Sequence, residues 1–139
     1  MLFRSRALLR MANEIADVGG IGLPLAQARE EYGGLTGDIL GRFIAAGDPG
    51  AVHALQELGR NIGAACASLA AVLDPELFVI GGGVSVAGDL LLDPIRESYL
   101  QNLPARGFHP EAKFVIAELV NDAGVVGAAD LARIHSLAR

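Results

Sequence analysis

A short strand-forming segment that runs into three consecutive glycines constrains the fold more than any other feature of this sequence. Residues 77–80 read Leu-Phe-Val-Ile, follow Asp74-Pro75 and lead directly into Gly81-Gly82-Gly83. Apolar, β-branched and aromatic residues favour a strand, and glycine allows positive φ angles and close approach to the backbone. Ligands of open α/β folds bind at the carboxyl edge of the sheet. We therefore predict a strand over residues 77–81 whose glycine turn lies at a ligand-binding edge.

Two common nucleotide-binding loops do not fit this turn. A dinucleotide-binding fingerprint that starts at Gly81 requires Gly or Ala where the chain has Val86. A P-loop that starts at Gly83 reaches Gly88 at the right spacing, but the position of the phosphate-binding Lys holds Asp89, which repels phosphate. A tight strand-to-helix turn without a ligand remains the alternative.

The N-terminal third of the chain is predicted to be helical over residues 6–46. An amphipathic pattern of apolar residues predicts a first helix over residues 6–18. A short helix is expected from Pro24 to about Tyr32. A third helix is expected over residues 37–46, with Thr36 as its N-cap.

The longest predicted helix spans residues 49–73. Asp48-Pro49 marks its start, because Asp is a favoured N-cap and Pro is favoured at the first helical position. Residues 62–73 are its most apolar part and are expected to be buried on all sides. Gly59 and Gly63 reduce helix stability, so we expect another element to pack closely there. The apolar seam of this helix contains Ala51, Leu55, Leu58, Ile62, Ala65, Leu69 and Val72.

The residues after the long helix predict a βαβα arrangement, so residues 48–139 comprise the long helix followed by βαβα. A short helical turn is expected over residues 87–91, a helix over 93–102, a second strand over 113–119 and a last helix over 121–137. Two strands that are each followed by helices predict a parallel βαβ unit. A two-strand parallel sheet is not a stable layer on its own. The fold class is therefore α/β and helix-rich, and residues 1–139 are expected to form one partial domain.

The composition of the chain indicates which kinds of binding partner to expect. Apolar residues make up 52% of the chain and charged residues 19%, so part of the surface is expected to be covered by further chain or by a second subunit. No apolar run is long enough to cross a membrane, and no secretory signal is visible. A net charge of −5 without a Lys/Arg cluster makes nucleic acid an unexpected partner. The single cysteine, Cys66, fits a reducing cytoplasm.

Several segments together carry a family resemblance. Leu-Asp-Pro-Glu-x-x-Val-Ile-Gly-Gly-Gly-Val-Ser over residues 73–85 resembles the C-terminal lobe of ROK-family proteins, which are bacterial sugar kinases and sugar-responsive repressors. The likeness extends to residues 46–49 and 121–129 and covers roughly residues 6–134, whereas residues 1–5 do not fit the family. It implies part of an actin/hexokinase-like, ribonuclease H-like ATPase lobe.

The resemblance also implies a function for the glycine turn. In ROK kinases a Gly-Gly-x-Ser turn lies beside the adenosine of ATP, which implies ATP binding by Gly82, Gly83, Val84 and Ser85, with Gly81 at the strand end. The implied parent is a cytoplasmic, ATP- and Mg-dependent glucokinase that converts glucose to glucose 6-phosphate in glycolysis. A homo-oligomer, most simply a dimer, is implied as well.

The family's catalytic parts are not found in this sequence. We find no Asp-x-Gly-Gly-Thr phosphate loop, no Asn-Asp-x-Asn segment for the catalytic Asp and no Gly-Thr-Gly loop. The zinc motif of the family needs three cysteines and a histidine, and cannot be built from Cys66 with His53, His109 and His135. Asp122 is more readily explained as a helix N-cap than as a catalytic acid. We therefore expect no catalytic or metal-binding residue here, and a C-terminal fragment that is inactive alone.

Two alternatives stay open at this point. The chain could be the sugar-sensing lobe of a ROK repressor, or an oligomerisation module whose glycine turn binds no nucleotide. The residues that would select the sugar are not in this sequence.

Overall fold

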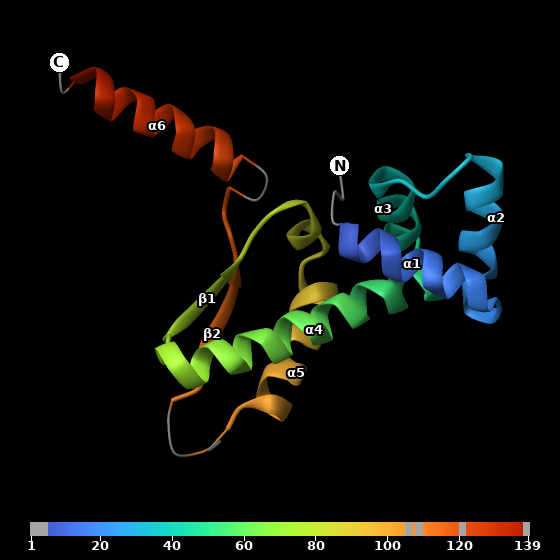
Figure 1. The fold of residues 1–139 in the computed structure, drawn as a ribbon, viewed down its shortest axis with the longest axis horizontal. Coiled ribbons are helices and arrows are strands. Elements are labelled where there is room, and N and C mark those ends of the chain that lie inside the picture. The colour runs from blue at the N-terminus through green and yellow to red at the C-terminus, as the bar shows by residue number, and fades with distance from the viewer. Residues whose placement is uncertain (1–5, 105–106, 108–109, 120–121, 138–139) are drawn as a thin grey trace.

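The computed structural model describes residues 6–104, 107, 110–119 and 122–137. Predictions for residues 1–5, His109 and Asn121 lie outside this part of the chain. Figure 1 shows the arrangement. The elements are α1 (Arg6–Val18), η1 (Gly20–Gly22), α2 (Leu23–Glu31), α3 (Gly37–Ala45), α4 (Pro49–Leu73), β1 (Leu77–Ile80), η2 (Gly83–Ala87), α5 (Asp89–Asn102), β2 (Lys113–Ile116) and α6 (Ala123–Leu137).

The first three helices gather around the N-terminal half of α4 (Figure 1). Each lies within one residue of its predicted position. Thr36 caps α3 as expected, because its Oγ1 accepts a hydrogen bond from the Ile39 N–H at 3.3 Å. Fully buried leucines fill the space between these helices, and they are Leu8, Leu25, Leu40 and Leu55.

The long helix α4 begins and ends where the sequence predicts. Asp48 Oδ1 accepts a hydrogen bond from the Ala51 N–H at 2.9 Å, which satisfies one of the free donors at the helix start. At the other end, Asp74 takes a left-handed conformation with φ 45°. Its N–H donates to the Ala70 carbonyl at 3.0 Å. Both ends are therefore fixed by local hydrogen bonds.

Residues 62–73 are not buried on all sides, and that expectation was wrong. Ala51, Leu55 and Leu58 are buried, but the seam becomes exposed towards the end of the helix, where Val72 is 81% exposed. The cause is the position of the neighbouring elements. Helices α1–α3 surround the first half of α4, whereas α5 covers one flank of the second half (Figure 1).

Helix α5 packs against α4 through the two glycines, as predicted. A Cβ atom at Gly59 would lie 2.7 Å from Pro94 Cγ. A Cβ atom at Gly63 would lie against the Ile95 carbonyl oxygen and 2.8 Å from Ser98 Cβ. The two helices therefore approach so closely that even a methyl group does not fit between them.

Helix α5 starts earlier than predicted. The expected turn over residues 87–91 and the helix start at Asp93-Pro94 are replaced by η2 and by one continuous helix from Asp89. Pro94 removes a single backbone donor, and its ring lies on the bare surface of Gly59. This contact buries the ring, and the burial offsets part of the cost of a proline inside the helix.

The two strands form a parallel sheet in the register Leu77↔Lys113 to Ile80↔Ile116. Both strands are shorter than the predicted 77–81 and 113–119. Strand β1 ends at the glycine turn, so β2 loses its partner soon afterwards. The last rung is the bond from the Ala117 N–H to the Ile80 carbonyl at 2.9 Å.

The two faces of this sheet differ. On the inner face, Phe78, Tyr99 and Phe114 form an aromatic cluster with ring centroids 5.0–6.0 Å apart. This cluster joins both strands to α5. The opposite face, here called the outer face, presents Leu77, Val79 and Val115, with the exposed Lys113 opposite Leu77.

The last helix, α6, extends away from the rest of the molecule (Figure 1). Its apolar residues Val125, Val126, Leu131 and Ile134 are exposed, and Leu131 is 60% exposed. None of the helices in the described part of the chain is long and apolar enough to cross a membrane.

The α4–α5 contact yields a first testable expectation. We expect Gly63→Ala to lower the free energy of unfolding by about 1–3 kcal/mol, because the added methyl overpacks the contact by more than the improved helix propensity offsets. Urea unfolding monitored by far-UV circular dichroism measures the change. Gly127→Ala in α6 is the matched control, since its added methyl meets nothing within 4 Å. Equal stabilities for the two variants would contradict the close contact.

Candidate functional site

The glycine turn projects from the carboxyl end of β1. Gly82 has φ 88° and ψ 178°, a conformation that is essentially restricted to glycine. Gly81 and Gly82 are exposed, and a Cβ atom at Gly82 would meet nothing within 4 Å. Gly83 begins η2 and is half-buried. The turn therefore presents open backbone at the edge of the sheet where the sequence predicts a ligand.

Ser85 faces inward and holds this turn together. It is buried, and its hydroxyl donates to the Gly82 carbonyl at 2.7 Å. Its backbone N–H donates to the same carbonyl at 3.1 Å. Val84 is half-buried and packs against the core. Of the five residues predicted to bind ATP, Gly81 and Gly82 are thus the most open, whereas Ser85 fixes their conformation.

The charges beside the turn are unfavourable for phosphate. Asp89 opens α5, and its carboxylate lies 3.7 Å from the Arg96 guanidinium. Arg96 also contacts Asp93 at 3.2 Å and donates to the Phe114 carbonyl at 3.2 Å. This guanidinium therefore ties α5 to β2. Residues 81–85 contain no cationic side chain, so the exposed Asp89 carboxylate beside the turn disfavours an anionic ligand group there.

Asp122 follows β2 and precedes the first residue of α6. Its carbonyl accepts from the Val126 N–H at 2.9 Å, and its own N–H donates to the Leu119 carbonyl at 2.7 Å. These bonds agree with a residue at a helix start. The candidate metal ligands are dispersed, with His53 and Cys66 on opposite halves of α4 and His135 in α6. Within the described residues, no three His, Cys, Asp or Glu side chains gather closely enough to hold a metal ion.

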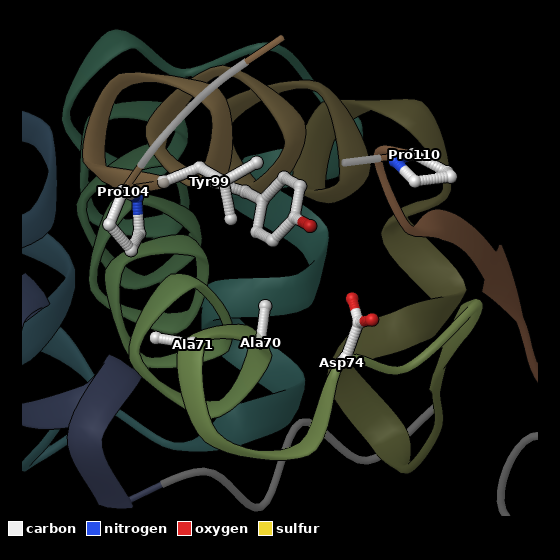
Figure 2. A pocket seen from close by; sticks show the side chains of 7 residues that line it. Ala70, Ala71, Asp74, Tyr99, Pro104 and Pro110 are labelled. Atoms are coloured by element: carbon white, nitrogen blue, oxygen red, sulfur yellow. The ribbon is translucent and has the colours of Figure 1, made fainter. Parts of the chain in front are cut away.

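A cavity of about 270 Å³ lies at the opposite edge of the sheet, where the strands begin. Figure 2 shows the Asp74 carboxylate and the Tyr99 hydroxyl facing this space. The Tyr99 oxygen accepts a hydrogen bond from the Ala112 N–H at 3.2 Å. Sequence reasoning missed the cavity, because its walls come from separate segments without a shared motif. It is lined by Ala70, Ala71, Asp74, Tyr99, Leu103, Pro104 and Pro110.

Cys66 is the single cysteine of the sequence and is buried in α4. Burial raises the pKa of the Cys66 thiol above its usual value. The thiol therefore stays protonated near neutral pH, which argues against a nucleophilic role.

Comparison with known proteins assigns this fold to a family. The model of the ROK family matches residues 20–135. The chain belongs to the ROK family. It is 42% identical over 132 residues to a glucokinase from Streptomyces coelicolor, covering 92% of this chain and 41% of that enzyme.

Two solved structures extend the likeness to three dimensions. A ROK glucokinase from Streptomyces griseus, in complex with glucose and AMPPNP, matches with a TM-score of 0.78 at 40% identity over 92% of this chain and 42% of that one. A ROK hexokinase from Thermus thermophilus matches with a TM-score of 0.52 at 31% identity over 75% of this chain and 36% of that one. The fold is thus part of the actin/hexokinase-like ATPase fold of ROK sugar kinases. The chain spans about two fifths of the length of its glucokinase relatives.

The backbone of the turn supplies a second expectation. We expect Gly82→Ala to lower the free energy of unfolding by about 1–3 kcal/mol, because alanine is strained in that conformation. Gly81→Ala is the matched control, since its added Cβ makes an ordinary contact of 3.4 Å with Ala117 Cβ. Urea midpoints measured at an unchanged m-value compare the two. A Gly82→Ala variant as stable as Gly81→Ala would show that the turn relaxes to another conformation.

Proposed function

We propose that this chain is the carboxyl-terminal portion of an ATP-dependent ROK glucokinase. The observation that supports this most strongly is the match to the Streptomyces griseus glucokinase, which extends over 92% of the chain at 40% identity. That glucokinase was solved with glucose and AMPPNP. In the proposed reaction, the γ-phosphoryl group of ATP is transferred to the 6-hydroxyl of glucose.

Within this enzyme, we assign the glycine turn to the adenosine side of ATP. Gly81 and Gly82 offer exposed backbone that a flat, uncharged ring can approach closely. The neighbouring Asp89 carboxylate disfavours the triphosphate at the start of α5. Ser85 and Val84 then act from within, by holding the turn in its open shape.

Catalysis requires more than this half-site. Phosphoryl transfer depends on phosphate positioning, on Mg²⁺ and on a group that orients the attacking hydroxyl. We assign all three functions, together with recognition of the sugar, to the part of a ROK kinase that this chain does not span. Because correct positioning provides most of the rate enhancement, we expect the chain alone to leave glucose unphosphorylated.

Titration with ATP tests the assignment of the turn. We expect saturable shifts of the backbone amide resonances of residues 81–85 in ¹H–¹⁵N NMR spectra, and smaller changes around the cavity near Asp74. A dispersed spectrum that ATP leaves unchanged would refute nucleotide binding by this chain.

A variant pair makes the test specific. Gly81→Val is expected to weaken ATP binding at least tenfold, because it adds a branched side chain beside the exposed backbone that the ring would approach, while its Cβ makes an ordinary contact with Ala117. Gln27→Val is the matched control, because Gln27 is exposed on α2 and lies outside the glycine turn. This variant should bind ATP as the parent does. Equal affinities for all three proteins would place the nucleotide elsewhere.

A further inference from the structure

The sheet is covered on one face only. On the inner face, Phe114 is buried beneath α5. On the outer face, Val79 is 58% exposed, and Leu77 and Val115 are exposed beside it. Parallel strands are almost always covered on both faces, because their connecting helices lie on both sides. Apart from Lys113 at the start of β2, the strand residues of the outer face are apolar like those of a buried surface, yet they are exposed.

Helix α6 likewise exposes residues that are typical of a packed surface. Gly124, Gly127, Leu131 and Ile134 follow one another at spacings of three, four and three residues, which puts them on one stripe of the helix. Leu131 and Ile134 are exposed, and added Cβ atoms at the two glycines would meet nothing within 4 Å. We call these four residues the α6 stripe. Small residues at one end and large apolar ones at the other suit close packing on a neighbouring element.

An isolated helix of this length is marginal in water. Helix α6 has 15 residues, which is at the upper end of the length of about 12–15 residues below which propagation gains too little to offset nucleation. Gly124 and Gly127 weaken it further. Its stability must therefore come mainly from packing of the stripe against another surface.

The pairing of the strands points to the nature of that surface. In the described part of the chain, β1 pairs with β2 alone, so each strand has one edge without a strand neighbour. Such edges add further strands readily. A partner that supplies both strands and a covering layer would satisfy the edges, the outer face and the α6 stripe together.

We propose that the outer face and the α6 stripe form the docking surface for the amino-terminal portion of a ROK sugar kinase, and that α6 becomes stably helical only when that portion is docked. The inference rests on the proposed function in treating this chain as one portion of such a kinase. The lengths of the two proteins support this choice of docking partner, because the match covers 92% of this chain but 42% of the Streptomyces griseus glucokinase. The remaining portion belongs to the same polypeptide in that enzyme.

A chimera tests the proposal. The segment of the Streptomyces coelicolor glucokinase that matches this chain is replaced by this chain, and Val79→Lys is introduced into both the chimera and the free chain. We expect Val79→Lys to lower the thermal midpoint of the chimera by about 5 °C or more and to leave the free chain within about 1 °C, because the lysine is buried only in the chimera.

Leu23→Lys is the matched control, since Leu23 is 54% exposed on α2 and lies outside the docking surface. It should have little effect in either protein. Hydrogen exchange reports on α6 directly, and we expect amides of residues 126–135 to exchange at least a hundredfold more slowly in the chimera than in the free chain.

Three outcomes would overturn the proposal. They are a chimera that tolerates Val79→Lys as well as Leu23→Lys, a parent chimera that aggregates while the free chain stays monodisperse, and a free-chain dimer that Val79→Lys dissociates. The last would identify a second copy as the occupant. None of these measurements uses nucleotide or sugar, so a turn that fails to bind ATP would refute the assignment of the turn to adenosine and leave the docking surface intact.

Discussion

The close contact between α4 and α5 positions the two strands and the glycine turn. Helix α4 leads through Asp74 into β1, and α5 carries the chain from the glycine turn back towards β2. Both strands and the turn therefore depend on how these two helices pack. Gly59 and Gly63 bring the helix backbones together, and the Ser98 hydroxyl donates to the Arg60 carbonyl at 2.6 Å across the contact. Because the separation of the helices is fixed, the position of the glycine turn at the carboxyl edge of the sheet is fixed as well.

The parts of the fold that were predicted correctly are those decided locally. Asp48 and Thr36 satisfy free donors in the next turn of their own helices, so a few residues contain the whole cause. The glycines of α4 predicted a close neighbour, although the sequence could not identify Pro94 as part of it.

The parts that were missed depend on contacts between distant segments. Helix α5 continues through Pro94, whose ring packs on a glycine of another helix. Strand β2 ends at Ile116 because its partner has already turned away. The exposure of Val72 depends on which side α5 occupies. None of these causes lies in the residues that surround the missed feature.

The candidate site also has features that the sequence indicated and features that it could not show. Three consecutive glycines after an apolar strand indicated an open turn, and the backbone of Gly82 agrees with that indication. The sequence could not show that the Ser85 hydroxyl is engaged within the turn. It also could not show the cavity between Asp74 and Tyr99, because three segments must fold before that space exists.

The aromatic cluster gives the chain a built-in optical reporter. There is no tryptophan and there are only two tyrosines, and of these Tyr32 is exposed whereas Tyr99 is buried between Phe78 and Phe114. Near-ultraviolet circular dichroism requires an asymmetric, rigid surrounding, so its tyrosine band arises chiefly from Tyr99. That band therefore reports whether both strands are seated on α5, without any label and independently of the helices that dominate the far-ultraviolet signal.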